Sequence, residues 1–483
     1  MTRISLIATL LLGLVPSLAL AQTDERTGIA VKPPDQEGDA LGGMIDGRFG
    51  VGMIDEDVFL TINVGTALKW RKLGVGIQVP LRLRISDNDP KADGVFREED
   101  WDEPSDWTRV LRYVSWGQPN DPIYARLGVL AGTTLGHGTI VDRYYNVIDA
   151  DHYQTGVQVH LDFDVAGGQT FLDNLLDPEI WAIRGYVRPF RLFEGMSKVL
   201  DGIYVGTTLA IDALAPNRIE TEQNQNQTPV VDSKRNIVTK PTSVFLWGLD
   251  IGWALNPYEW WAATPYMDVN VLGSTGGAGF HLGMLHTFDI AEGVVRLGTR
   301  IEYRAMDGDY APSYINSWYE VERFSYLRRC DVNSFCHDVP KHRALKDIDE
   351  AGLDDTRHGW HASMDITILN TITLSMLAED YEGSNNANMM LRLLLPYIAG
   401  FKFSAYYAKR NFGGVEEMFD LDRGLLVSEL KYKFWGPMFA YAQYAREWKV
   451  NEDRDGNGNR TDEFGRYETI DTFDIGVGVE FTF

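Results

Sequence analysis

Cysteine is scarce in this sequence of 483 residues, which holds only Cys330 and Cys336, close together in one polar stretch. So few cysteines exclude a small scaffold that is held together by many disulfides. No further cysteine or histidine pair at zinc-ligand spacing accompanies the two. The sequence therefore predicts no structural zinc site.

Long apolar runs are also nearly absent. The one extended apolar stretch covers residues 4–20, and every later run is too short for a membrane-spanning helix. The mean hydropathy of −0.21 is typical of a soluble protein. These features exclude a bundle of membrane-spanning helices.

Basic residues are in the minority, with 45 Lys and Arg against 69 Asp and Glu and a net charge of −24. This acidity excludes nucleic acid as a partner, because phosphate backbones repel an acidic surface. The sequence also lacks the Gly-x-Ser-x-Gly and His-Glu-x-x-His motifs, and its histidines are scattered. We therefore predict that the protein is not an enzyme and has no catalytic residues.

An export signal is present at the N-terminus. Arg3 precedes the apolar stretch, and Ala19, Leu20 and Ala21 provide small residues for cleavage before Gln22. We predict a signal peptide over residues 1–21, with an uncleaved membrane anchor as the alternative. Residues 22–46 are polar and are predicted to form a flexible periplasmic tail.

Export changes the expectation for the two cysteines. In an exported protein, the spacing of Cys330 and Cys336 predicts a local disulfide. The bond would close a small loop and contribute about 2 kcal/mol on loop-entropy grounds. Two free thiols are the alternative.

Alternating apolar and polar residues recur along most of the chain. Ile77 and Val79, for example, flank Gln78, and a strand would place them on the face opposite that polar side chain. The pattern recurs at residues 58–68, 157–165, 295–304 and 401–410. In such a strand, apolar lipid-facing residues alternate with polar lumen-facing ones, so their hydropathies cancel in any window. A mean hydropathy like that of a soluble protein is therefore compatible with a membrane barrel. A closed barrel also leaves no backbone group unpaired in lipid.

The final strand carries the most specific pattern. Apolar residues occupy one face of it up to the last residue, namely Phe473, Ile475, Val477, Val479, Phe481 and Phe483. This segment resembles the C-terminal strand of Gram-negative outer-membrane β-barrels, including porins. The resemblance implies a location in the outer membrane, contact with its lipid, and recognition of the strand as an assembly signal by the barrel-assembly machinery.

Connection lengths predict one all-β domain over residues 47–483, a closed antiparallel transmembrane barrel with short periplasmic turns and long outer loops. The strand count depends on residues 139–148. If they form a strand, about 20 strands result. If they fold into the lumen, about 18 remain and a nearby boundary is misplaced. Tryptophans near the proposed periplasmic strand ends, such as Trp70 and Trp435, suit an aromatic girdle.

Candidate pore-lining residues are the charged and polar side chains that alternation places on the inner face or that belong to residues 139–148 and their flank. They are Arg82, Arg84, His137, Asp142, Arg143, Arg184, Arg188, Arg296, Arg300 and Arg304. The alternative, which is compatible with a channel, is that the inner charges pair with Asp162, Asp164, Glu302, Glu429 and Glu480 and hold the wall rigid. Residues 136–139 read Gly-His-Gly-Thr, and the glycines allow close backbone approach. This segment is expected to line a constriction or a solute site. The alternative is a tight outer hairpin followed by a strand.

A possible calcium site lies near the C-terminus. Asp453, Asp455, Asn457 and Asn459 place oxygen ligands at alternate positions, as in the first half of an EF-hand loop. The second half departs from that pattern, because Phe464 stands where the last ligand would be. A flexible outer loop without calcium is the alternative, and no other cofactor is expected.

These features predict a porin-like channel for passive or selective passage of small solutes. A non-conducting surface protein, whose large outer loops bind a partner, is the main alternative. Neither the solute nor the oligomeric state follows from the sequence.

Overall fold

The computed structural model describes residues 41–54, 57–86, 94–97, 100–119, 121–147, 153–193, 197, 199–222, 228–291, 293–330, 336–353, 355–383, 386–421, 424–452, 461 and 464–483. The predicted signal peptide, most of the predicted tail and the four candidate calcium ligands lie outside these residues.

The wall of the protein is one antiparallel sheet. Its strands in the first half of the chain are β1 (Leu41–Ile54), β2 (Asp57–Trp70), β3 (Leu73–Ser86), β4 (Leu111–Trp116), β5 (Ile123–Gly128), β8 (Gly156–Asp162), β9 (Ala166–Leu172), β10 (Ile180–Val187), β11 (Ile203–Ile219), β12 (Thr239–Trp253) and β13 (Leu255–Tyr258). Those in the second half are β14 (Trp261–Leu272), β15 (Ala278–Ile290), β16 (Val295–Met306), β19 (Arg357–Ile368), β20 (Ile372–Tyr381), β21 (Ala387–Ile398), β22 (Phe401–Phe412), β23 (Gly424–Trp435), β24 (Met438–Val450) and β25 (Tyr467–Thr482).

The sheet closes on itself because β1 pairs with both β2 and β25. In the closing ladder, Met44 faces Thr482 and Ile54 faces Thr472. β12 and β13 both pair with β14 and together occupy one position in the wall. The result is a closed barrel of 20 strands, which confirms the predicted fold class.

Two boundaries differ from the sequence prediction. β1 begins at Leu41 rather than at residue 47, because Gly42 and Gly43 conceal the alternation there. Residues 139–148 are not a wall strand, yet the barrel has 20 strands. The alternation of residues 157–165 runs through a tight turn between β8 and β9, in which Phe163 donates its backbone N–H to Ala166 at 3.0 Å. The turn divides this segment into two strands, so the wall reaches 20 strands without residues 139–148.

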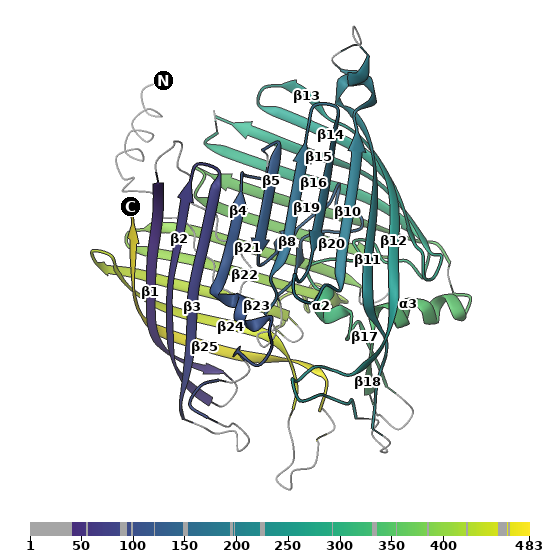
Figure 1. Ribbon diagram of the computed structural model, residues 1–483. Coiled ribbons are helices and arrows are strands. Elements are labelled where there is room, and N and C mark those ends of the chain that lie inside the picture. The colour runs from purple at the N-terminus through teal and green to yellow at the C-terminus, as the bar shows by residue number, and fades with distance from the viewer. Residues whose placement is uncertain are drawn as a thin grey trace.

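The two ends of the barrel differ in their connections. Trp70 and Leu73, and likewise Trp435 and Met438, are joined by tight turns at the end where β1 starts and β25 finishes. The long link between β16 and β19 lies at the opposite end, with β17 (Leu327–Cys330), β18 (Cys336–Val339) and α3 (Lys341–Glu350) (Figure 1). Bacterial barrels have periplasmic termini, so we call these ends the periplasmic end and the outer end.

The outer face of the wall is apolar. On β12, the exposed side chains Phe245, Trp247, Leu249 and Ile251 alternate with buried ones such as Asp250. At the periplasmic end, aromatic side chains cluster on the face of the wall that points away from the lumen. They include Trp260, Trp261 and Phe288. A lipid-compatible band with aromatic girdles is the surface of a transmembrane barrel. Separately, no helix in the described part of the chain is long and apolar enough to cross a bilayer.

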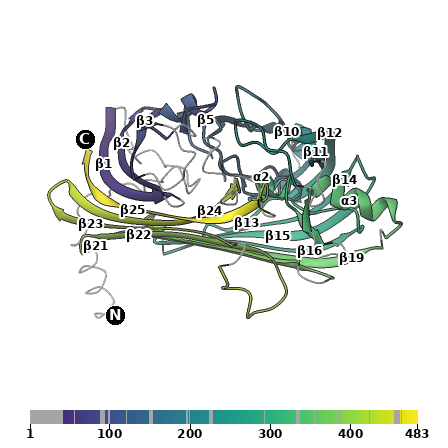
Figure 2. The ribbon, with the colours of Figure 1, turned by 90° about the horizontal axis from the view of Figure 1, so that it is seen from below.

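The barrel is flattened in cross-section, and chain segments lie inside the ring of strands (Figure 2). The first in-folded loop, residues 129–147, follows β5 and contains β6 (Ala131–Thr133) and β7 (Tyr144–Tyr145). The second in-folded loop, residues 307–326, follows β16 and contains α2 (Tyr319–Glu322). Both loops contribute fully buried residues to the largest hydrophobic cluster, which therefore lies inside the barrel.

Candidate functional site: a constriction in the lumen

The two in-folded loops are joined to each other by backbone hydrogen bonds. Ile315 donates to Ile140 at 3.1 Å, Asp142 donates to Ile315 at 3.0 Å, and Ser313 donates to Thr139 at 2.9 Å. Val141 and Ile315 also form a parallel bridge. The loops therefore form one unit, which we call the constriction.

The constriction contacts walls on both sides of the barrel. Tyr144 and Ile315 belong to a buried cluster with Phe171 of β9 and Val244 of β12. Tyr145 and Trp318 belong to another, with Met390, Tyr406, Ala408 and Trp448 of β21, β22 and β24. These two sets of strands are far apart in the order of the wall. The constriction thus crosses the lumen.

His137 fixes the tip of the first in-folded loop against the wall. Its Nδ1 lies 2.8 Å from Asp268 of β14, and its Nε2 lies 2.7 Å from the hydroxyl of Tyr204 of β11. The imidazole stacks on Tyr266, with ring centroids 4.1 Å apart. Thr139 donates a further hydrogen bond to Asp268 at 2.7 Å. The tip is therefore bound by polar contacts on several sides.

Two glycines allow this close approach. Gly136 and Gly138 have φ of +57° and +81°, a backbone region that favours glycine. A Cβ on Gly138 would lie 2.6 Å from Nη1 of Arg300, and one on Gly136 would lie 2.8 Å from Nε of Arg184. A Cβ at either position would therefore have to displace an arginine side chain, in addition to the strain of a positive φ.

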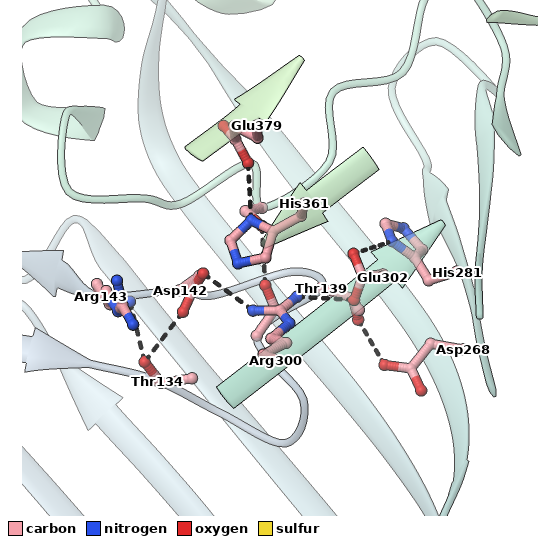
Figure 3. Close-up of polar contacts among 12 residues, drawn as sticks. Thr134, Thr139, Asp142, Arg143, Asp268, His281, Arg300, Glu302, His361 and Glu379 are labelled. Atoms are coloured by element: carbon pink, nitrogen blue, oxygen red, sulfur yellow. Dashed lines mark hydrogen bonds and ion pairs between the residues drawn. The ribbon is translucent and has the colours of Figure 1, made fainter. Parts of the chain in front are cut away.

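Arg300 of β16 connects the first in-folded loop to the wall network. Its Nη1 lies 3.0 Å from Asp142, and its Nη2 lies 2.8 Å from Glu302 (Figure 3). Glu302 also pairs with Arg304 and lies 3.1 Å from Nδ1 of His281. The network ends on β19 and β20, where the Glu379 carboxylate lies 3.1 Å from Nδ1 of His361 and 2.9 Å from Nη1 of Arg304. It is buried and rich in charge-assisted hydrogen bonds, which makes it rigid.

The remaining predicted pore-lining arginines each pair with a carboxylate. Arg184 lies 3.1 Å from Asp250, Arg84 lies 2.8 Å from Asp57, and Arg82 pairs with Asp100. Near the periplasmic end, the corresponding distances are 2.7 Å for Arg188 and Asp162 and 3.5 Å for Arg296 and Asp289. The wall is consequently less positive than the arginines alone suggest.

Arg143 makes the most solvent-accessible contact of the first in-folded loop with the wall. Its Nη2 lies 3.3 Å from Asp365 of β19, and the two side chains are 18% and 52% exposed. Asp365 lies near the periplasmic end of β19, which finishes at Ile368. Water therefore reaches the constriction from that end.

On the outer side, Arg323 neutralises several acids. Its guanidinium lies 2.6 Å from Glu179, 3.1 Å from Asp212 and 3.8 Å from Glu320. Burial raises the pKa of Glu320 to about 7, against the lowering effect of Arg323. Tyr144 donates a hydrogen bond to Glu320 at 2.5 Å, which ties both in-folded loops to this group.

Apart from Asp142, the acids of the site were not predicted from the sequence as site residues, although Glu302 was expected as a partner of the inner arginines. Asp250, Asp268, Glu302 and Glu379 lie on the inner face of their strands by the same alternation that assigned the arginines. That alternation could have found them, whereas their pairing with the in-folded loops had no sequence signal.

Two sequence predictions, the disulfide and the calcium site, involve side chains outside the described residues. Cys330 and Cys336 face each other across the β17–β18 ladder, which is the register that a cross-strand disulfide needs. Their side chains lie outside the described residues, so the disulfide stays a prediction. The calcium prediction also stays one. Among the described residues, no group of three His, Cys, Asp or Glu could hold a metal ion.

Comparisons with known proteins give only weak similarities. No family model and no curated protein matches the chain. A solved variant of the ferric enterobactin receptor of Pseudomonas aeruginosa, in complex with enterobactin, has a TM-score of 0.40 and 12% identity, covering 93% of this chain and 82% of that one. Pseudomonas aeruginosa OccK11 has a TM-score of 0.31 and 11% identity, covering 96% of this chain and 100% of that chain.

Pseudomonas aeruginosa OpdK with vanillate has a TM-score of 0.32 and 10% identity, covering 92% of this chain and 99% of that chain. Scores this low carry no argument about this protein. The assignment depends instead on its own strand pairings, apolar exterior and charged interior. By these features, the chain is a closed antiparallel β-barrel of 20 strands with an apolar outer face and a charged interior.

Proposed function

We propose that the protein is a channel for small solutes in the Gram-negative outer membrane, and that its selectivity is set by the constriction. A barrel of 20 strands is wider than its own wall side chains can fill. The lumen contains charged networks and a narrowing loop unit that is held by polar contacts as well as by two apolar clusters. Polar contacts can be exchanged for contacts with a solute or with water, which a purely apolar seal would not permit.

The exposed Arg143–Asp365 pair carries this proposal. The ion pairs around Arg300 are buried, whereas Asp365 is half exposed while contacting Arg143 of the first in-folded loop. For this reason we place the solute path beside Arg143. Export through the predicted signal peptide and lipid contact through the apolar outer face belong to the same proposal.

The charge balance beside this path favours a weak preference for anions. Arg392 of β21 lies on the inner face near Tyr406, and Arg143 also acts electrostatically on Tyr406. Asp365 is the acid paired with Arg143. Two cations beside one carboxylate attract anions, but only weakly, because the other wall arginines are neutralised.

The second candidate is a non-conducting surface protein that binds a partner through its outer loops. One observation favours it: the constriction contacts walls on both sides of the lumen. A complete seal would leave the outer loops as the functional surface.

Single-channel recording of the purified protein in planar bilayers tests the proposal. We expect discrete conductance steps, an increase of about twofold in Arg143→Ala because the narrowest path widens, and a shift of the zero-current potential toward cations. Arg191→Ala is the matched control, since the pair of Arg191 with Asp164 is exposed and lies at the periplasmic end. No conductance in any variant would favour the surface-binding candidate. If the conductance of Arg143→Ala equals that of the original chain, the solute path lies elsewhere.

A further inference from the structure

A polar cavity of about 320 Å³ lies among the outer connections of the barrel. Its lining comes from the β3–β4, β9–β10, β11–β12 and β16–β19 links, from the first in-folded loop and its continuation toward β8, and from the start of β25. Ligand pockets begin at roughly this size. The cavity includes Glu320 of the constriction, so it lies on the outer side of the proposed path.

Amide groups and one guanidinium are among the lining groups that the fold holds in place. The Asn146 amide accepts from Leu130 N–H at 2.9 Å and donates to Asp173 O at 2.7 Å. Arg323 is held by Glu179 and Asp212. Groups fixed in this way bind a ligand without first losing conformational freedom.

Two lining residues carry buried polar atoms that have no hydrogen-bond partner among the described residues. They are Oε1 of Gln154, an acceptor, and Nε of Arg323, a donor. Arg323 is itself only 4% exposed. Buried polar atoms are nearly always hydrogen-bonded, so an unmatched donor and acceptor in one cavity indicate a group that can serve both. A hydroxyl group does so.

Aromatic rings complete the lining. Phe324 and Tyr467 both face the cavity and contact each other, with ring centroids 5.8 Å apart. Tyr153 also lines it. Aromatic faces bury the C–H surface of a ligand while the amides take its polar groups.

We propose that this cavity binds an uncharged polyhydroxylated solute, the size of a mono- or disaccharide, before it enters the constriction. The proposal rests on the channel function above and assigns its substrate class. An anion is disfavoured by Glu103, Asp177, Glu179 and Glu320 in the lining. The attraction of a cation is reduced, because Arg323 pairs with Glu179 and Glu320, and Lys234 lies 3.8 Å from Glu103.

Saturation-transfer NMR on the full-length protein in detergent micelles tests the ligand class without requiring conduction. The probes are glucose, sucrose and trehalose, with gluconate and glucosamine as charged analogues of glucose. We expect saturation transfer to the ring protons of the neutral sugars. Gln154→Ala should weaken binding about tenfold, since it removes one buried hydrogen-bond acceptor. Gln118→Ala, in a periplasmic turn, is the matched control and should bind as the original chain does.

Each outcome of these measurements either supports the proposal or overturns part of it. Saturation transfer that is absent for all neutral sugars, or stronger for gluconate or glucosamine, overturns the ligand class. Equal binding by Gln154→Ala and Gln118→Ala would show that the sugar binds elsewhere, which overturns the assignment of this cavity as the binding site. Heat-modified mobility on gels confirms that each variant forms a barrel. Sugar binding without conductance would contradict the channel function but leave the cavity as a sugar site. Conductance without sugar binding would support the channel function and reject the sugar site.

Discussion

Arg300 and Asp142 form a buried ion pair at 3.0 Å although 158 positions separate them in the sequence. The pair joins the first in-folded loop to β16, and Arg300 also binds Glu302. The constriction is therefore held to the wall by a charge that two carboxylates share.

Removing Arg300 should loosen the constriction more than removing Asp142. Arg300→Gln leaves Asp142 without its cation, and breaking a buried pair from one side costs about 3–5 kcal/mol. Asp142→Asn should cost less, because Arg300 keeps Glu302. Limited proteolysis of residues 129–147 and thermal unfolding in micelles measure this order. Arg296→Gln is the control: its pair with Asp289 is exposed, so it should cost less than about 1 kcal/mol. A cost of Asp142→Asn equal to that of Arg300→Gln would contradict the shared-charge arrangement.

Gly138→Ala should displace the tip of the first in-folded loop. The substitution adds backbone strain at φ +81° and places a Cβ 2.6 Å from Arg300. Gly276 is the matched control, since it has φ of +93° but no atom of the described residues would lie within 4 Å of its Cβ. Gly276→Ala should show the strain alone, about 1–2 kcal/mol. The difference between the two variants in thermal stability, and a change in conductance confined to Gly138→Ala, measure the steric part. Identical behaviour of the two would show that Gly138 is not in close contact with the wall.

The constriction should open more readily as the pH rises. Burial raises the pKa of Glu320 from 4.5 to about 7, so the folded protein holds a proton that the opened state gives up. This stabilisation is complete below about pH 4.5 and is lost as the pH rises through about 7. Asp173, whose pKa burial also raises, acts in the same direction. The groups facing Glu320 are Asp173, Glu179, Asp212, Tyr144 and Arg323.

Hydrogen exchange of residues 129–147 and 307–326, corrected for intrinsic rates, measures this opening. Protection should be higher at about pH 5 than at about pH 8. Glu320→Gln should reduce the difference, while Glu350→Gln at the exposed end of α3 should leave it unchanged. Protection that rises with pH would reverse the sign and reject the role of Glu320.

Cys330 and Cys336 should form a disulfide in the outer loop. They face each other across β17 and β18, and the alternative of free thiols predicts the opposite labelling. A membrane-impermeant thiol reagent on whole cells should label the protein only after reduction. Labelling before reduction would exclude the bond. Labelling that needs a broken outer membrane would place the loop on the periplasmic side.

The two ends of the chain should control export and assembly. We expect cleavage before Gln22, seen as a mature N-terminus by mass spectrometry. Phe481 is 51% exposed on the lipid face of β25, so Phe481→Asp should lower the outer-membrane yield. The neighbouring Thr482→Asp changes the opposite face and should be tolerated better. Equal yields of the two variants would show that the apolar face of the strand is not read during assembly.

Alternation allowed much of the wall to be predicted. On β16, Ile301 and Tyr303 face outward while Arg300, Glu302 and Arg304 are buried inside, as the sequence indicates. The alternating residues 473–483 likewise correspond to β25, where Phe473, Ile475 and Val477 are exposed. A period of two residues depends only on local backbone geometry, so the sequence can show it.

The constriction could not be predicted in the same way. Its pairing of Val141 with Ile315 and its contact of His137 with Asp268 join segments that are distant in sequence. β4 and β5 are only six residues long, and such short alternations are weak signals. The turn between β8 and β9 continues the alternation, which is why its boundary was missed.

The seam between β1 and β25 joins the two ends of the chain, whereas both in-folded loops arise from connections in its interior. The constriction can therefore assemble against β9–β16 while the seam is still open. Loop segments that cross a finished barrel would have to thread through it, and such routes are slow because distant contacts must form late. We expect the order of folding to be wall segment, lumen contents, then closure. On this order, the last ladder to form encloses an interior that is already packed.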